Sequence, residues 1–203
     1  MTITKAAFEV LKKTLSCITF NSHVAICGSY ALFEFERLVL KRSPELQWIP
    51  TDCDVFCLKM SKATFWDLIV TFLKRIMKHG FRFRLSRNTF THMYYKSICI
   101  VDFEIYHQSV KENIPKISFV LRTEKNIFSV VEGFDIDICR IILRFDKNGK
   151  PIFRCTNDVY VSVRAKQFKV SVRTAGEDWL EELTRERVKK YKRRGYKYAG
   201  NLR

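Results

Sequence analysis

Residues 23–58 read HVAICGSYALFEFERLVLKRSPELQWIPTDCDVFCL, and this stretch decides the fold. Its opening HVAIC is a short apolar run, which predicts a buried strand that stops at Gly28-Ser29. Residues 30–41 have the apolar spacing of a helix. At the end of the stretch, residues 52–58 (DCDVFCL) predict a second short strand. A strand, a glycine-serine junction, a helix and a strand that opens with two aspartates therefore follow one another.

The remaining chain adds helices and a group of antiparallel strands. Ser61 is a good N-cap for the most regular helix, which is expected to end at Gly80. The Asn148-Gly149 pair predicts a hairpin turn. The other expected elements are a helix at 2–19, strands within 81–107 with a turn near Asn88, a strand at 116–122, a short helix at 128–132, strands at 134–143 and 151–155, and a helix at 178–195.

This order of elements predicts an α+β fold with a mixed sheet flanked by helices. With 203 residues, 47% of them hydrophobic and 14% aromatic, the chain is long enough to bury a substantial core. We expect one domain over residues 1–177, followed by a basic C-terminal helix and tail over 178–203.

The formal net charge of +16 comes from 37 basic and 21 acidic residues. Such an excess favours polyanionic partners, mainly RNA or DNA, because binding releases counterions from the phosphates. A basic protein without a polyanionic partner is the alternative. The charge itself says nothing about the fold.

Seven cysteines are present, and most of them lie in apolar runs. Cys53 and Cys57 lack a second pair of ligands that would complete a zinc site, so we expect buried free thiols in a reducing compartment. No signal peptide and no run of about 18 apolar residues is visible, which predicts an intracellular protein without a membrane partner. The sequence is silent on the oligomeric state.

The Gly28-Ser29 turn and the two aspartates of the opening stretch can serve the same chemistry. Asp52 and Asp54 are two residues apart on a strand, so both side chains point to the same face and can reach one metal site. Hard cations such as Mg²⁺ or Mn²⁺ prefer such oxygen ligands. Gly28 permits close approach of the backbone to a phosphate, and Ser29 with the following helix N-terminus supplies donors. A surface turn and solvated acids are the ordinary alternatives for each motif taken alone.

Four blocks in order resemble the nucleotidyltransferase superfamily, which has the DNA polymerase β-like fold. They are similar above all to nucleotidyltransferase-like proteins of large DNA viruses. The resemblance implies a nucleoside triphosphate held by Gly28 and Ser29, Mg²⁺ or Mn²⁺ on Asp52 and Asp54, and transfer of a nucleotidyl group to a nucleic-acid or protein hydroxyl. It also implies a viral origin, in the host cytoplasm or the virion. The blocks are ICGSY at 26–30, WIPTDCDVF at 48–56, FDIDICRIIL at 134–143 and KKYKRRGYKY at 189–198.

The family also uses a third carboxylate, and the sequence leaves its identity open. Asp102 in IVDFEI and Asp137 in FDIDI, with its neighbour Asp135, have the expected apolar surroundings. Either Asp137 or Asp102 would complete the catalytic cluster, with Asp137 as a further metal ligand. If the strand KISFVL is the equivalent one, Ser118 stands at this place and the cluster is incomplete, which would indicate a degenerate enzyme.

The C-terminal tail is strongly basic, and tyrosines are interleaved with its cations. That mixture suits stacking and backbone contact on single-stranded nucleic acid. A solvated helix, or a tail that docks onto the domain, would have the same composition. The chain could then be a catalytically degenerate fold that binds nucleic acid or has a structural role in a virion. The predicted nucleic-acid-binding residues are Lys189, Lys190, Lys192, Arg193, Arg194 and Lys197.

Overall fold

The computed structural model describes residues 5–42, 48, 50–92, 97–108, 110, 114–171 and 178–202. The elements over these residues are α1 (Lys5–Ser16), β1 (Val24–Cys27), α2 (Ser29–Leu38), β2 (Asp52–Leu58), α3 (Lys62–Lys78), β3 (Phe81–His92), β4 (Ser97–His107), β5 (Lys116–Arg122), α4 (Ile127–Glu132), η2 (Asp137–Cys139), β6 (Ile142–Phe145), β7 (Pro151–Arg154), α5 (Asn157–Arg164), β8 (Gln167–Ser171), α6 (Asp178–Arg193) and β9 (Lys197–Leu202).

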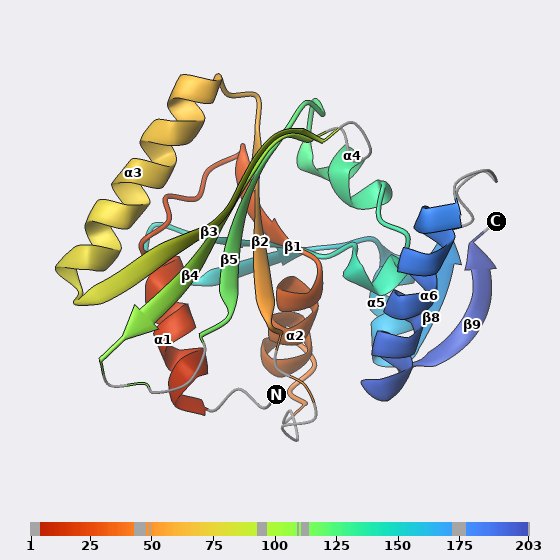
Figure 1. Cartoon of the computed structure of the whole chain (residues 1–203). Coiled ribbons are helices and arrows are strands. Elements are labelled where there is room, and N and C mark those ends of the chain that lie inside the picture. Colours follow the sequence, from red (N-terminus) through yellow and green to blue (C-terminus); the bar gives the residue numbers. More distant parts are fainter. Residues whose placement is uncertain are drawn as a thin grey trace.

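A mixed seven-stranded sheet with strand order β3-β4-β5-β2-β1-β6-β7 forms the centre of the protein (Figure 1). β2 and β5 run parallel, and the other neighbouring strands of this sheet pair antiparallel. A second, two-stranded parallel sheet joins β8 to β9. The expected α+β class with a mixed sheet is confirmed.

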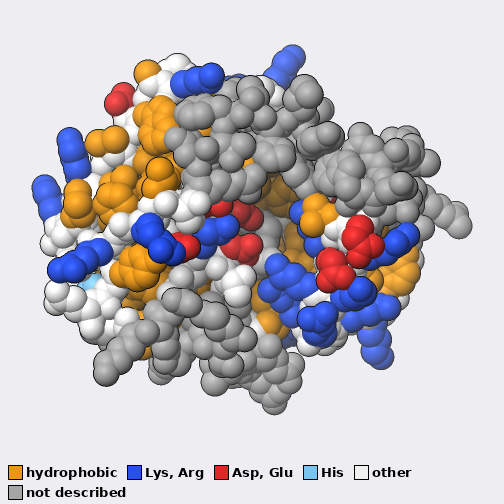
Figure 2. Space-filling view, in the orientation of Figure 1, with side chains coloured by type: hydrophobic (Ala, Val, Ile, Leu, Met, Phe, Trp, Pro, Cys, Tyr) orange, Lys and Arg blue, Asp and Glu red, His pale blue; other side chains and the backbone are white. Residues whose placement is uncertain are grey.

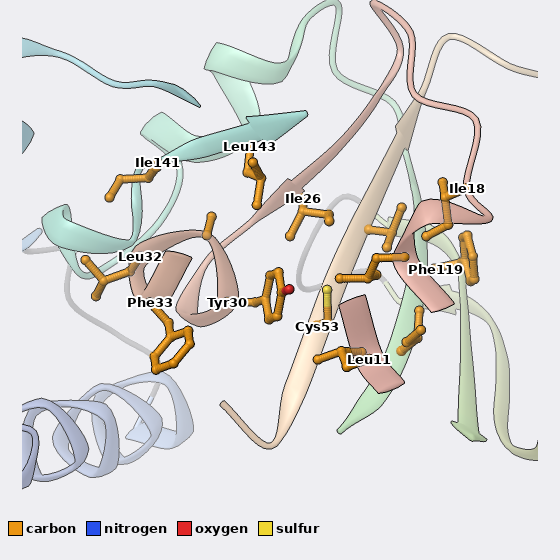
Figure 3. Close-up of a cluster of buried hydrophobic side chains, with 14 of the residues drawn as sticks. Leu11, Ile18, Ile26, Tyr30, Leu32, Phe33, Cys53, Phe119, Ile141 and Leu143 are labelled. Atoms are coloured by element: carbon orange, nitrogen blue, oxygen red, sulfur yellow. The ribbon is translucent and has the colours of Figure 1, made fainter. Parts of the chain in front are cut away.

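One face of the large sheet is covered by α1, α2 and α3. Side chains at alternate positions of β2, such as Cys53, enter this core together with Leu11 of α1 and Tyr30 of α2 (Figure 3). The ring centroids of Phe72 in α3 and Phe119 in β5 are 5.1 Å apart. Because burial of apolar area is the main favourable term in folding, this layer holds β2 in place.

The opposite face of β2 is apolar at one end and charged at the other. α4 covers the apolar end with Ile127 and Val130, which pack in one cluster with Phe56 and Val120. Asp54 lies on the same face, two residues before Phe56, because strand side chains alternate. The charged end of this face is therefore the place where polar chemistry is possible.

The C-terminal elements pack back onto the domain. Tyr191 and Tyr196 are buried in the main hydrophobic cluster. The carboxylate of Asp135 accepts hydrogen bonds from Arg187 Nη1 at 2.7 Å and from Thr184 Oγ1 at 3.0 Å, which fixes α6 against the segment before η2. Side chains of α6 also line the cleft that contains Asp52 and Asp54, so the tail forms one wall of that cleft.

Several sequence-based assignments differ from the structure. β3 continues through Asn88, which pairs with Val101 of β4, so the turn expected at Asn88 is wrong. In the segment 134–143, residues 137–139 form a 3₁₀ turn instead of a strand, and β6 starts at Ile142. Strand β9 was not expected, because Gly200 and Asn201 are poor strand formers.

The helix cap expected at Ser61 and the turn expected at Asn148-Gly149 are confirmed. Ser61 accepts a hydrogen bond from the Thr64 backbone at 3.1 Å and caps α3. The Asn148-Gly149 turn joins β6 to β7. All seven cysteines are free thiols, and Cys155 is the one that is not fully buried. Within the described residues, no helix has the length and apolar character that crossing a membrane requires.

Candidate functional site

A cleft of about 650 Å³ opens on the charged face of β2, between α4 and α6. Its size is typical of small-molecule sites. Figure 2 shows acidic side chains at the centre of this side of the molecule with Lys and Arg side chains close to them. The lining residues are Gly28, Ser29, Asp52, Asp54, Phe56, Ile100, Val120, Arg122, Glu124, Ser129, Val130, Gly133, Phe134, Asp135, Ile136, Cys139, Leu183, Arg187, Lys190 and Tyr191.

The glycine-serine turn and the paired aspartates share this cleft. Cys27, the last residue of β1, lies opposite Asp54 of β2 in the antiparallel ladder. Gly28 follows with φ 80° and ψ −146°, a conformation that essentially only glycine adopts. A Cβ atom added to Gly28 would lie 3.7 Å from Asp54 Oδ2. The glycine therefore keeps the backbone turn directly beside the carboxylate.

The N-terminus of α2 opens into the same cleft. Gly28 caps this ten-residue helix without a side-chain hydrogen bond, which leaves its first backbone N–H groups directed outward. Ser29 Oγ lies 3.0 Å from Tyr191 Oη, 3.3 Å from Lys190 Nζ and 3.3 Å from Arg194 Nη1. The helix dipole and two cations from α6 and the turn that follows it make this end of the cleft electropositive.

The paired aspartates lie in a region of low polarity. Burial, followed by the charges of Asp52 and Asp102, raises the pKa of Asp54 to about 7, while Lys116 and Lys190 act in the opposite direction. Burial and the neighbouring Arg194 likewise lower the pKa of Lys190, which Asp52 and Asp54 partly offset. The carboxylates and cations of the cleft are therefore close enough to interact electrostatically with one another.

Asp102 occupies the same face but is separated from the pair by a strand. Asp54 pairs with Ser118 of β5, and Ser118 pairs with Asp102 of β4, so the three form one row across the sheet. Lys116 Nζ donates to Asp102 Oδ2 at 3.0 Å, and the buried Oδ1 has no hydrogen-bond partner. Over the described part of the chain, no three His, Cys, Asp or Glu side chains are placed to hold a metal ion.

Asp137 lies outside the cleft and has a structural environment. Its Oδ1 accepts hydrogen bonds from the backbone N–H groups of Ile138 and Lys169, both at 2.8 Å, and its Oδ2 accepts from Ser162 Oγ at 3.0 Å. These contacts tie η2 to α5 and β8. We therefore no longer assign Asp137 to the catalytic cluster or to metal binding, because its acceptor positions serve the fold.

The predicted nucleic-acid-binding cations divide into two groups. Lys190 lines the cleft, and Arg194 is buried with its guanidinium 4.0 Å from the Trp48 ring centroid. Both side chains lie 3.3 Å from Ser29 Oγ, so these two residues dock the tail onto the domain, and their predicted contact with nucleic acid stays a prediction. The other four side chains are exposed, and Lys189 forms an ion pair with Glu186 at 2.7 Å. The four are Lys189, Lys192, Arg193 and Lys197.

The sequence left open whether the basic tail docks onto the domain, and it did not single out the face that does so. Arg187, Lys190, Tyr191 and Arg194 stand at positions i, i+3, i+4 and i+7, which places them on one side of a helix. This spacing was a visible signal, but a helical face made of cations is ordinarily solvated. The acids that it meets lie on β2, far away in the sequence.

Comparison with known sequences finds no matching family and no matching relative. Among solved structures, the chain is similar to a CCA-adding enzyme in its apo form, with a TM-score of 0.41 and 11% sequence identity. The match covers 81% of this chain, which spans about a third (32%) of that enzyme's chain. A likeness at this level assigns neither a family nor an activity.

Gly28→Ala is expected to destabilise the protein by about 1–3 kcal/mol, because alanine is strained at this φ and ψ. Gly133→Ala is the control, because Gly133 has φ −72° and ψ −5°, a conformation that alanine adopts without strain. Urea unfolding measures both. Equal losses would contradict a special constraint at the Gly28 turn.

Asp137→Ala is expected to lower the free energy of unfolding by roughly 2–4 kcal/mol, because one buried backbone N–H group, one part-buried backbone N–H group and a hydroxyl lose their acceptor. Asp67→Ala, at an exposed position of α3, should change it by less than about 0.5 kcal/mol. Chemical denaturation compares the two. A wild-type midpoint for Asp137→Ala would argue against the structural role.

Proposed function

We propose that the cleft binds a nucleoside triphosphate together with a divalent cation, and that the protein is a nucleotidyltransferase-like enzyme. The observation that supports this most directly is that the Gly28 turn and Asp54 lie side by side in the cleft, where a Cβ atom added to Gly28 would be in ordinary van der Waals contact with Asp54 Oδ2, 3.7 Å away. The exposed backbone of Gly28 can contact the phosphates of a ligand. The carboxylate of Asp54 beside it can contact the cation bound to those phosphates.

The triphosphate is expected to lie against the N-terminus of α2 and the inward face of α6, beside the point where the two meet at Ser29. Lys190 Nζ and Arg194 Nη1 each lie 3.3 Å from Ser29 Oγ, so the three side chains form a cluster of donors. Backbone N–H groups at a helix N-terminus add to the attraction for phosphate. Arg187, which lines the same cleft, extends the basic wall.

The donor set on β2 fits a divalent cation bound with its nucleotide. Asp52 and Asp54 lie on one face. Burial, followed by the charges of Asp52 and Asp102, raises the pKa of Asp54, and a bound cation would favour the charged form of this carboxylate. Mg²⁺ is usually held by one or two carboxylates plus substrate phosphates, so two protein ligands are sufficient. When bound, Mg²⁺ or Mn²⁺ would supply neutralisation of the charge on the phosphate oxygens.

Nucleotide binding is better supported than transfer. Asp102 is the remaining candidate for the third carboxylate. We propose that it orients the attacking hydroxyl of a nucleic acid or protein. Its ion pair with Lys116 must open, or be shared, before its carboxylate can orient that hydroxyl. The acidic row Asp54–Ser118–Asp102 supplies the direction of approach.

Isothermal titration with ATP and Mg²⁺ tests the binding site. Asp52→Ala/Asp54→Ala should abolish the measurable heat, and Lys190→Ala should weaken binding by about tenfold or more, because a charged phosphate contact is lost. Lys189→Ala is the control on the same helix, since Lys189 is exposed and paired with Glu186. Its affinity should stay within about twofold of wild type. Equal heats from the wild type and the double aspartate variant would refute the site.

A second candidate function is nucleic-acid binding without catalysis, as expected of a degenerate enzyme. The ion pair between Lys116 and Asp102 favours it, as does the exposed basic group of Lys192, Arg193 and Lys197. Tyr198 lies beside this group, with Lys192 Nζ 5.9 Å from its ring centroid. Cations beside an aromatic ring suit contact with a single strand.

A mobility-shift assay with single-stranded RNA over a salt series tests the surface assigned to this second function. Lys192→Ala/Lys197→Ala should reduce the slope of log affinity against log salt by about 1.5, because two phosphate contacts are lost. The double variant Lys74→Ala/Lys78→Ala, on the exposed side of α3, should leave the slope unchanged. Binding that is lost in neither double variant would argue against the assigned surface.

A further inference from the structure

Ser29 Oγ is a shared acceptor for two cations of the C-terminal segment. Lys190 Nζ and Arg194 Nη1 both donate to it at 3.3 Å. Within the described residues, neither cation forms an ion pair with a carboxylate. An ammonium group has three donors and a guanidinium group has five, so each cation keeps donors that a phosphate can accept. The position of Ser29 Oγ therefore sets where these donors lie.

The hydroxyl of Tyr191 is the third partner of Ser29. Its Oη lies 3.0 Å from Ser29 Oγ and 2.8 Å from Cys139 Sγ. A serine hydroxyl has two acceptor positions and one hydrogen, and the two cations occupy both acceptor positions. The hydrogen of Ser29 is therefore donated to Tyr191 Oη. Tyr191 in turn donates its own hydrogen to Cys139 Sγ.

The far end of this chain of hydrogen bonds is fixed in the fold. Tyr191 is 2% exposed and belongs to the main hydrophobic cluster. Burial raises the pKa of Tyr191 well above its ordinary value, so its hydroxyl keeps its hydrogen at neutral pH. The backbone N–H of Gly28 donates to the carbonyl oxygen of Cys139 at 3.3 Å, so the residue that ends the chain also supports the Gly28 turn. Tyr191 therefore links η2 to Ser29.

We propose that Tyr191 is a positioning residue of the triphosphate site and that it acts through Ser29. By holding the Ser29 hydroxyl, Tyr191 fixes the acceptor around which Lys190 and Arg194 direct their remaining donors to the phosphates. The inference rests on the proposed function, because it takes the phosphates to lie at the N-terminus of α2. The nucleobase has no part in this arrangement, so ATP and inorganic triphosphate depend on Tyr191 alike.

The ring and the hydroxyl of Tyr191 can be separated by substitution. Phenylalanine keeps the ring contacts with Phe168 and Tyr196, and it keeps a ring beneath Arg194, whose guanidinium carbon lies 5.1 Å from the ring centroid. It removes only the group that accepts the Ser29 hydrogen. Tyr196→Phe is the matched control, because Tyr196 is equally buried at 2% and is not one of the residues that line the cleft.

Titration calorimetry of the intact chain with Mg²⁺ and either ATP or inorganic triphosphate tests the inference as a double-mutant cycle. Tyr191→Phe should weaken the binding of both ligands by about fivefold, the effect of losing one hydrogen bond, and Ser29→Ala by at least as much. The double variant Tyr191→Phe/Ser29→Ala should bind within about twofold of Ser29→Ala, because the two residues act as a unit. Tyr196→Phe should stay within about twofold of wild type.

Thermal unfolding of each variant verifies that it is folded. If Tyr191→Phe does not fold, Cys139→Ala takes its place in the cycle, because it removes the acceptor of the Tyr191 hydrogen and leaves Tyr191 itself intact. The same lack of additivity with Ser29→Ala is then expected.

The outcomes distinguish this inference from the proposed function. If Tyr191→Phe binds both ligands as tightly as wild type, or if the two single losses multiply in the double variant, the inference is overturned. Loss of binding in Asp52→Ala/Asp54→Ala would still support the proposed function in either case. A loss that affects ATP but not inorganic triphosphate also overturns the inference. If neither ligand binds to the wild type, the proposed function and the inference both fail.

Discussion

Two carboxylates on a central strand are the constraint on which the rest of this structure depends. Asp52 and Asp54 alternate with Cys53 and Val55, whose side chains enter the main core, so the strand cannot rotate its acids toward solvent. Transfer of a carboxylate away from water is costly unless positive charge or hydrogen-bond donors compensate it. The surrounding elements supply both, through Lys190, through Lys116 and through the open N-terminus of α2.

The packing of the C-terminal helix follows from this constraint. Positive charge beside the acids comes from one face of α6, and that face is held in place by Asp135 with Arg187, and by the buried rings of Tyr191 and Tyr196. Lys166 adds a cation–π contact with Tyr196, its Nζ lying 4.5 Å from the ring centroid. The helix thus supports the fold and also forms the electropositive wall of the cleft. This double role explains why Arg187 and Lys190 face inward instead of toward solvent.

The parts of the fold that depend on local sequence were predictable. The strand that ends at Gly28, the helix after it and the acidic strand β2 are each encoded by a short apolar pattern, and their adjacency places Gly28 and Asp54 together. The identity of the third acid was not predictable, because Asp102 and Asp137 have similar local surroundings. Their positions in the fold differ: Asp102 falls in line with Asp54 across β5, whereas Asp137 lies in a 3₁₀ turn and is hydrogen-bonded to α5 and β8.

The same logic explains the two unequal halves of the cleft. Strand alternation places every second residue of β2 and β5 on the cleft face, so a change from Asp54 to Phe56, or from Ser118 to Val120, converts a polar row into an apolar one within one repeat. The cleft therefore offers a polar surface at one end and an apolar surface at the other. A helix or an irregular loop would not enforce such an abrupt boundary. The polarity of the cleft is therefore set by the period of the strand, and Lys190 of α6 lies at its polar end.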